Sequence, residues 1–219
     1  MLKLGAISDT HNQHSNKWAL EPCDIIIHCG DFSFHGNPSE INQFFVDAKK
    51  ALKDTGAKYF LLTPGNHELG VQANESLFRQ MCKDNGITLL VQEAIELEGI
   101  KFFGTPFQPF FCDSAYNIED SEKLTELYDQ IPQDTQVLIT HCPPKGMLDY
   151  SPMCGNVGSP ELWTKVQSML GTLKYHFFGH IHYSHGVKEF LGTKFINAAI
   201  VSDHYNLNPQ DSRMIVVEL

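Results

Sequence analysis

The sequence predicts a layered α/β fold in which short buried strands alternate with amphipathic helices. Short apolar runs closed by Gly, Pro or polar residues recur from the first residues onward, and segments with an apolar stripe at helical spacing separate them. Further apolar runs meet at Gly99 and Gly192, where tight turns predict a second, partly antiparallel sheet. A chain of 219 residues suits one domain, so we expect a single domain over 1–219.

The expected strands are short, apolar and closed by polar or turn-forming residues, as buried strands are. Those expected to form the central sheet span 2–8, 24–28, 58–63, 136–140 and 175–178. Those expected in the second sheet span 87–97, 100–104, 185–191, 193–197 and 214–218.

Helices are expected between these strands. The segment 38–53 begins after Asn37, a suitable N-cap, carries an apolar stripe that includes Ile41 and Phe44, and ends before Gly56. Segments 74–85, 120–130 and 160–170 show a similar pattern. The longest irregular stretches, 105–118 and 142–158, are expected to overhang a site.

Composition excludes several classes of protein. The formal net charge of −10 disfavours binding of nucleic acid or of an anionic membrane through a basic surface. The apolar fraction of 42% supports a buried core, and no stretch approaches membrane-spanning length. Asp9 interrupts the first apolar run before a signal peptide is complete, and six cysteines form no CxxC pair, so we expect a cytoplasmic location.

Polar residues follow each of the five central strands. An Asp or His at one strand end is commonly a turn residue or a helix cap, so a single instance indicates little. Here the pattern repeats at every strand, and Gly twice precedes the polar residue. The candidate metal ligands are Asp9, His11, Asp31, Asn66, His141, His180 and His182.

These candidates suit two divalent ions. Strands of one sheet would bring their carboxyl ends together, and i, i+2 spacing on extended chain would point Asp9 and His11, or His180 and His182, to the same side. Carboxylate, imidazole and amide ligands without thiolates favour Mn, Fe, Zn, Co or Ni.

In this order the motifs Asp-x-His, Gly-Asp, Gly-Asn-His-Glu, His and Gly-His-x-His resemble those of the calcineurin-like metallophosphoesterase superfamily. The segments 30–32, 104–107, 141–146, 195–198 and Asn208-Pro209 resemble the small metallophosphoesterase-domain-containing proteins within it. The resemblance implies a four-layer αββα sandwich of two mixed sheets flanked by helices.

The resemblance also implies roles. Asp31 would bridge two metals, with Asp9, His11 and His182 on the first and Asn66, His141 and His180 on the second. Two cations would lower the pKa of a shared water, and the resulting hydroxide would attack phosphorus in line. The residues expected in catalysis are His67, Asp31 and Asn66.

The part played by the Gly-Asn-His-Glu motif is only partly defined by the sequence. His67 would stabilise the pentacoordinate phosphorus or protonate the leaving oxygen. Glu68 would either orient His67 or a metal ligand, or act as a carboxylate at a helix N-terminus.

We therefore expect a phosphodiesterase or phosphomonoesterase acting on a small substrate, with cyclic or other nucleotides the first class to test. The alternative is a noncatalytic or nucleotide-holding scaffold with the same fold. Two features leave substrate recognition open. Phe107, Phe110, Phe111 and Tyr116 would either stack on a base or pack as a lid, and the segment 205–209 would shape a nucleotide pocket or form a turn. His28 and His176 are expected to be core histidines.

Overall fold

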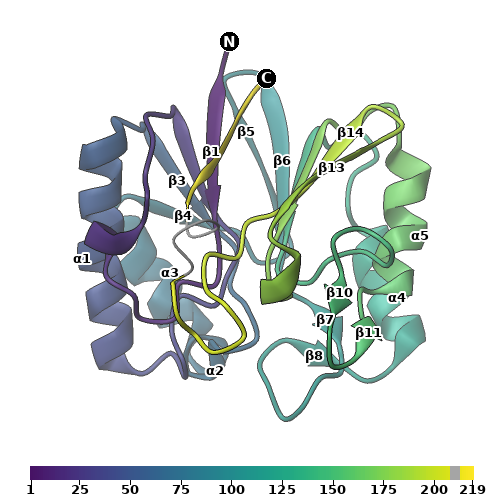
Figure 1. The fold of residues 1–219 in the computed structure, drawn as a ribbon, viewed down its shortest axis with the longest axis horizontal. Helices are drawn as coiled ribbons and strands as arrows, with labels where there is room; N and C mark the ends of the chain where they lie inside the picture. Colours follow the sequence, from purple (N-terminus) through teal and green to yellow (C-terminus); the bar gives the residue numbers. More distant parts are fainter. Residues whose placement is uncertain (208–212) are drawn as a thin grey trace.

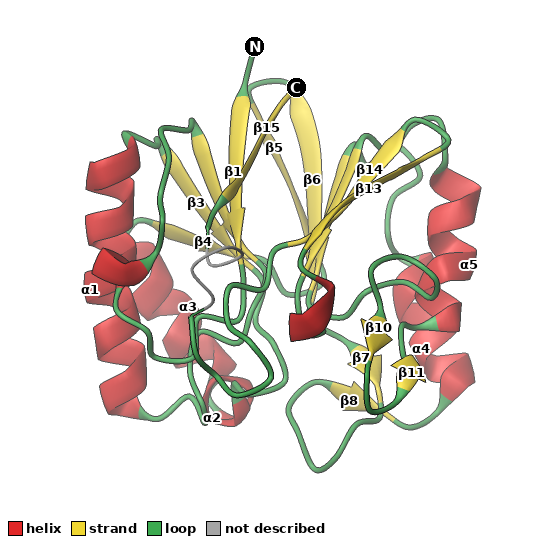
Figure 2. Ribbon diagram, in the orientation of Figure 1, coloured by secondary structure: helices red, strands yellow, loops and turns green. Residues whose placement is uncertain are grey.

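A computed structural model of the chain describes residues 1–207 and 213–219. Two mixed sheets pack face to face, and helices cover the outer face of each sheet (Figure 1). Figure 2 shows the same four layers, with red helices at both sides of the paired yellow sheets. The αββα sandwich predicted from the motifs is confirmed.

The first sheet is parallel except at one edge, where β15 runs antiparallel to β1. Its strand order is β15 (Ile215–Glu218), β1 (Lys3–Ile7), β2 (Ile25–His28), β3 (Tyr59–Leu62) and β4 (Ile87–Leu89).

The second sheet combines a parallel centre with an antiparallel hairpin at each edge. Its strand order is β13 (Gly186–Phe190), β14 (Thr193–Asn197), β12 (Tyr175–Phe178), β9 (Val137–Thr140), β6 (Ile100–Thr105) and β5 (Glu93–Leu97). The predicted turns at Gly99 and Gly192 close the two hairpins. Both glycines have positive φ, at 76° and 80°, as two-residue hairpin turns of this kind require.

The prediction that the five central strands share one sheet is wrong. β1, β2 and β3 lie in the first sheet, whereas β9 and β12 form the centre of the second. The segment 214–218, expected in the second sheet, instead forms the edge strand β15 of the first. An apolar run shows that a strand is buried, but each of these strands is buried equally well between a helix layer and a neighbouring sheet. The sequence pattern therefore does not distinguish the two sheets.

The expected strand over 87–97 is also wrong, because it is two strands. β4 pairs with β3 in the first sheet, and β5 pairs with β6 in the second. Between them the chain turns at Gln92, whose φ is 57°. The run has no Gly or Pro at this turn, so its composition carried no signal for the crossing.

The predicted helices form with ends shifted by at most two residues. They are α1 (Pro38–Thr55), α3 (Glu75–Asp84), α4 (Ser121–Asp129) and α5 (Pro160–Met169), and a short α2 (Leu69–Ala73) was not predicted. Asn37 and Glu40 form a capping box at the start of α1, and Gly56 ends the helix in the left-handed conformation. Within residues 1–207 and 213–219, no helix has the length and apolar character needed to cross a membrane.

Three apolar clusters hold the layers together. Ile25 and Ile27 of β2 belong to the cluster between the two sheets, whereas Ile26 faces the cluster beneath α1 and α3. The third cluster packs α4 and α5, through residues such as Leu124 and Leu162, against the second sheet. Successive side chains of β2 thus face different clusters, as expected for a strand that is buried on both faces.

Candidate metal centre

The candidate ligands lie just beyond the carboxyl ends of strands from both sheets. Asp9 follows β1, Asp31 follows β2 and Asn66 follows β3, all in the first sheet. His141 directly follows β9, and His180 follows β12, both in the second sheet. The centre is thus built between two sheets rather than along the edge of one.

The structure brings all seven candidate ligands together. Side chains that could hold an ion form three overlapping groups, each with its ligand atoms within 4.8 Å of one another. The first group is Asp9, His11 and His182. The second is His11, Asp31 and His67, and the third is Asp31, His141 and His180. Asn66 joins the third group, because its Oδ1 lies 2.9 Å from Nε2 of His141.

Asp31 lies at the centre of the cluster. Its Oδ2 is 3.2 Å from Nε2 of His141, 3.8 Å from Nε2 of His11 and 3.9 Å from Nε2 of His67. Its Oδ1 accepts a hydrogen bond of 2.8 Å from the backbone N–H of His67. This one carboxylate therefore belongs to two of the three groups.

Four imidazoles of the cluster are oriented in the same way. In each, Nδ1 donates to a backbone carbonyl that can only accept, so Nε2 carries no proton in the neutral ring and faces the carboxylates. The pairs are His11 with Ser33, His67 with Phe34, His141 with Cys29 and His182 with Ser202, at 2.8 to 3.1 Å. Three of these carbonyls lie in the loop around Asp31, which sets the ring orientations together with the carboxylate.

Burial and opposite charge compete in setting the protonation of these groups. Burial alone would raise the pKa of Asp31, but His141 and the neighbouring imidazoles hold it below its ordinary value. Burial lowers the pKa of His11 to about 4 and that of His180 to about 3. Burial also disfavours the charged form of His141, but the negative charge of Asp31 outweighs this effect and raises the pKa of His141 to about 9. The imidazoles of His11 and His180 are therefore neutral at pH 7, which is the form that can bind a cation.

The backbone is left-handed rather than extended at four of the seven candidate ligands. φ is 54° at Asp9, 38° at His11, 53° at Asp31 and 66° at His180. Non-glycine residues adopt this conformation at a cost and concentrate it at functional sites. The extended i, i+2 geometry expected for these motifs is wrong, and His180 and His182 in fact join different ligand groups.

Two glycines allow the loops to approach the carboxylates. A Cβ added at Gly65 would lie 2.3 Å from Oδ1 of Asp31, and one at Gly179 would lie 2.0 Å from Oδ2 of Asp9. Both distances are far inside van der Waals contact. The glycines of the two longest motifs are thus required by close packing on Asp31 and Asp9.

Glu68 is a buried carboxylate beneath Asp31. Its Oε2 accepts hydrogen bonds from the backbone N–H groups of Asp31 and Gly65, at 2.8 and 2.7 Å, and its Oε1 accepts from the N–H and Oγ of Ser33. It precedes α2 but makes no capping bond to that helix. Of the two roles considered from the sequence, the structure favours the orientation of a candidate metal ligand, namely Asp31.

Replacing Glu68 with alanine is expected to lower the free energy of unfolding by about 3 kcal/mol, because three backbone N–H groups lose their acceptor in a dry interior. Urea denaturation of the metal-free chain measures this. Glu75→Ala removes an exposed carboxylate that pairs with Arg79, and should cost below about 1 kcal/mol. Equal costs for the two variants would contradict the role given to Glu68.

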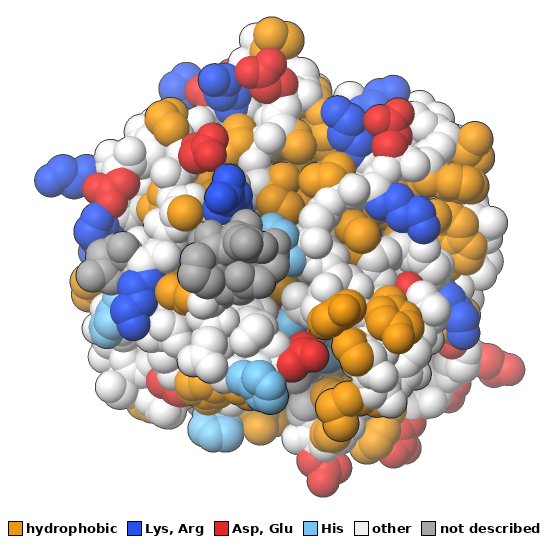
Figure 3. Space-filling model, in the orientation of Figure 1, with side chains coloured by type: hydrophobic (Ala, Val, Ile, Leu, Met, Phe, Trp, Pro, Cys, Tyr) orange, Lys and Arg blue, Asp and Glu red, His pale blue; other side chains and the backbone are white. Residues whose placement is uncertain are grey.

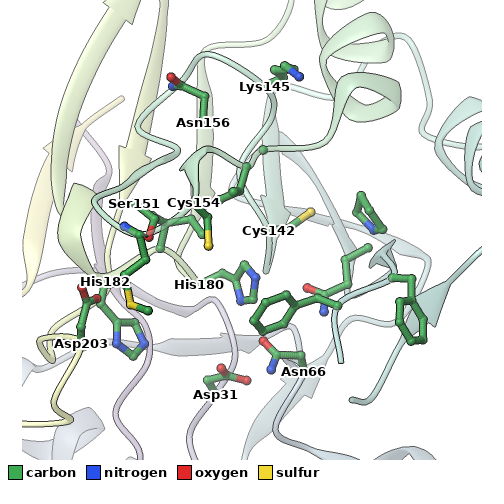
Figure 4. Close-up of a pocket in the computed structure, with 18 of the residues that line it drawn as sticks. Asp31, Asn66, Cys142, Lys145, Ser151, Cys154, Asn156, His180, His182 and Asp203 are labelled. Carbon is green, nitrogen blue, oxygen red and sulfur yellow. Dashed lines mark hydrogen bonds between the residues drawn. The ribbon is translucent and has the colours of Figure 1, made fainter. Parts of the chain in front are cut away.

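A cavity of about 680 Å³ opens onto the cluster. Asp31, Asn66 and His180 lie at one end of it, and Lys145 and Asn156 lie at the other (Figure 4). The irregular stretches 105–118 and 142–158 both contribute to its wall, as expected, and they also contain short strands that the sequence did not reveal. These are β7 (Gln108–Pro109), β8 (Asn117–Ile118), β10 (Tyr150–Ser151) and β11 (Gly155–Asn156).

The aromatic residues of the first stretch divide into two pairs. Tyr116 is buried and packs edge-on against Phe107, so this pair belongs to the sandwich. Phe110 and Phe111 are about half exposed and line the cavity. Of the two roles considered for this loop, packing onto the sandwich thus applies to Phe107 and Tyr116, and stacking on a base stays a prediction for Phe110 and Phe111.

Other predicted features also have defined places. Tyr205 forms a turn with Ser202, and its ring stands 4.8 Å from that of His11 at the cavity wall. Asn208 and Pro209 lie outside the described residues. His28 and His176 are fully buried, each beside a threonine hydroxyl, as expected of core histidines.

The cluster fits divalent cations. Nε2 of His11 is buried and has no hydrogen-bond partner in the described structure, although it points toward Asp31. A buried polar atom without a partner is costly unless something binds it. The surrounding carboxylate and imidazole donors are those that borderline divalent ions prefer, and the thiols of Cys29 and Cys142 point to no ligand group.

Two mixed sheets that converge on a shared group of carboxylates and imidazoles define a metal-binding sandwich of the metallophosphoesterase type. The chain belongs to the calcineurin-like phosphoesterase family, whose profile matches residues 2–184. Membership confirms the family predicted from the motifs and implies divalent metals and hydrolysis of phosphate esters.

Two known proteins and one solved structure are similar to the chain. The chain is 34% identical to the UPF0046 protein K07C11.7 of Caenorhabditis elegans, over 90% of this chain and 69% of that protein. It is 30% identical to the human Metallophosphoesterase domain-containing protein 1, over 97% of this chain and 69% of that protein. The solved structure of GAP50, the anchor in the inner membrane complex of Plasmodium, shares the fold, with a TM-score of 0.58 at 11% identity over 98% of this chain and 80% of that one.

Proposed function

We propose that this chain is a dinuclear metal-dependent phosphoesterase that hydrolyses small phosphate esters, with diesters as the preferred class. The observation that carries the proposal is the position of Asp31, whose carboxylate is shared by two ligand groups. Nε2 of His11, from one group, and Nε2 of His141, from the other, lie 3.8 and 3.2 Å from Oδ2 of this carboxylate. A carboxylate placed in this way suits two ions better than one.

The residues that would hold the ions follow from the three groups. Asp9, His11 and His182 would hold one, Asn66, His141 and His180 would hold the other, and Asp31 would serve both. When bound, such cations neutralise phosphoryl oxygens and lower the pKa of water.

His67 would supply a proton-transfer group beside the candidate ligands. His67 lines the cavity, with Nδ1 committed to the carbonyl of Phe34 and Nε2 3.9 Å from Oδ2 of Asp31. Its side chain is 27% exposed, so a phosphate ester in the cavity would reach it. This geometry suits a group that donates a proton to the leaving oxygen or stabilises charge on the phosphoryl group.

Metal removal tests the proposal. Protein stripped by a chelator is expected to lose hydrolysis of bis-p-nitrophenyl phosphate, and resupply of Mn, Ni, Co, Zn or Mg to restore it, because the proposed nucleophile is a hydroxide that forms near neutral pH only with the cations present. Release of p-nitrophenolate measures the rate, and p-nitrophenyl phosphate separates monoesterase from diesterase preference. Metal binding without turnover under any ion would instead support the noncatalytic or nucleotide-holding scaffold.

A further inference from the structure

The outer wall of the cavity is apolar. Phe110 and Phe111 come from the loop between β7 and β8, and Met153 and Val157 come from the β10–β11 hairpin. We call these four side chains the apolar wall. They are 51%, 52%, 90% and 42% exposed, respectively. Hydrophobic side chains gather over this hairpin on the face shown in Figure 3.

The fold does not require the apolar wall. None of its four side chains belongs to the three apolar clusters that hold the sandwich together. Exposed apolar groups clustered at a concave site, rather than scattered, are typical of ligand contact. Because these side chains line the cavity that opens onto the candidate metal centre, the ligand they would contact is the one bound at that centre.

The wall is joined directly to the candidate ligands. The ring of Phe111 lies edge-on to the ring of His180, with centroids 5.5 Å apart. A group attached to a phosphate held beside His180 would therefore lie within reach of Phe111. Flat rings pack well against such a partner, in stacked or edge-on arrangements.

Charge in the cavity favours an uncharged group. Among the described residues that line it, Lys145 is the only lysine or arginine, and it lies at the end far from Asp31 (Figure 4). Asp203 lines the side near His182. A second phosphate or carboxylate on the substrate would find one distant cation and a nearby carboxylate.

We infer that the apolar wall is a subsite for an uncharged aromatic ring on one arm of the phosphate ester, with Phe111 as its specificity-determining residue. This inference rests on the proposed function, because it takes the phosphoryl group to be held at the metal centre.

Calorimetric titration of the metal-loaded chain with phenylphosphonate and methylphosphonate tests the inference, since neither compound has an ester bond to hydrolyse. The phenyl compound is expected to bind about tenfold more tightly, as ring packing allows. In Phe111→Ala the ratio should fall to about twofold or less. Phe190→Ala is the matched control, because Phe190 is a partly exposed phenylalanine of β13 outside the cavity lining, and it should keep the full ratio.

The outcomes separate the subsite from the proposed function. Equal binding of the two phosphonates, or an unchanged ratio in Phe111→Ala, would overturn the subsite while hydrolysis of p-nitrophenyl esters still stands. Binding of neither compound to metal-loaded protein would overturn both. Because Phe111 is half exposed, its replacement should leave the folded state intact, and thermal unfolding checks this.

Discussion

Asp31→Asn is expected to lower hydrolysis of bis-p-nitrophenyl phosphate at least a thousandfold. Asparagine keeps the size of the side chain but removes the charge that two ligand groups share. It also places an amide N–H₂ where Oδ2 now lies 3.2 Å from His141. Loss of a shared anionic ligand would weaken the binding of both ions. It would thereby also weaken the stabilisation of charge in the transition state.

Metal analysis accompanies this rate measurement, and Asp31→Asn should bind fewer than two ions per chain. Asp24→Asn is a suitable control, because Asp24 lies at the other end of the same strand and accepts from the backbone of Lys3. It should keep both ions and full activity. Retention of two ions and near-normal turnover in Asp31→Asn would refute the bridging role.

His67→Gln is expected to lower kcat by about 10²- to 10⁴-fold while metal content stays unchanged, because the imidazole would act on the phosphoryl or leaving group rather than hold an ion. If His67 protonates the leaving oxygen, the loss should be large for an alkyl ester. It should be smaller for a p-nitrophenyl ester, whose leaving group needs no proton. A loss equal for both esters would indicate stabilisation of phosphoryl charge.

The structure also allows a different role for His67, that of a metal ligand, because its imidazole forms a ligand group with His11 and Asp31. A drop in metal content in His67→Gln would establish that reading and contradict the role in proton transfer. His35→Gln serves as the control, because His35 is an exposed histidine of a neighbouring loop. It should leave both activity and metal content unchanged.

The sequence predicted the identity of the cluster better than its construction. Residue types at strand ends were enough to select Asp9, Asp31 and His141, because ligand chemistry is encoded locally. Which sheet each strand joins was not encoded locally, so the convergence of two sheets was missed. The same limit explains the crossing at Gln92, where the chain passes from one sheet to the other with no Gly or Pro at the turn.

The backbone groups that contribute to the site could not be predicted from the sequence either. The carbonyls of Cys29, Ser33 and Phe34 orient three imidazoles, yet any residue type supplies a carbonyl. Only the loop conformation around Asp31 makes them available. Glu68 was recognisable as a motif residue, but its partners became clear only when the loops were placed next to each other.

The split of the ligands between the two sheets has a consequence for how the chain reaches its native state. Asp9 and His182 are 173 positions apart, and each sheet alone carries an incomplete ligand set. The full site can therefore appear only after the sheets have docked. Cations that bind only the docked form act as a reversible crosslink, adding about 2.7 kcal/mol of stability when their concentration is a hundredfold above Kd. Metal supply would then govern the lifetime of the folded chain as well as its chemistry.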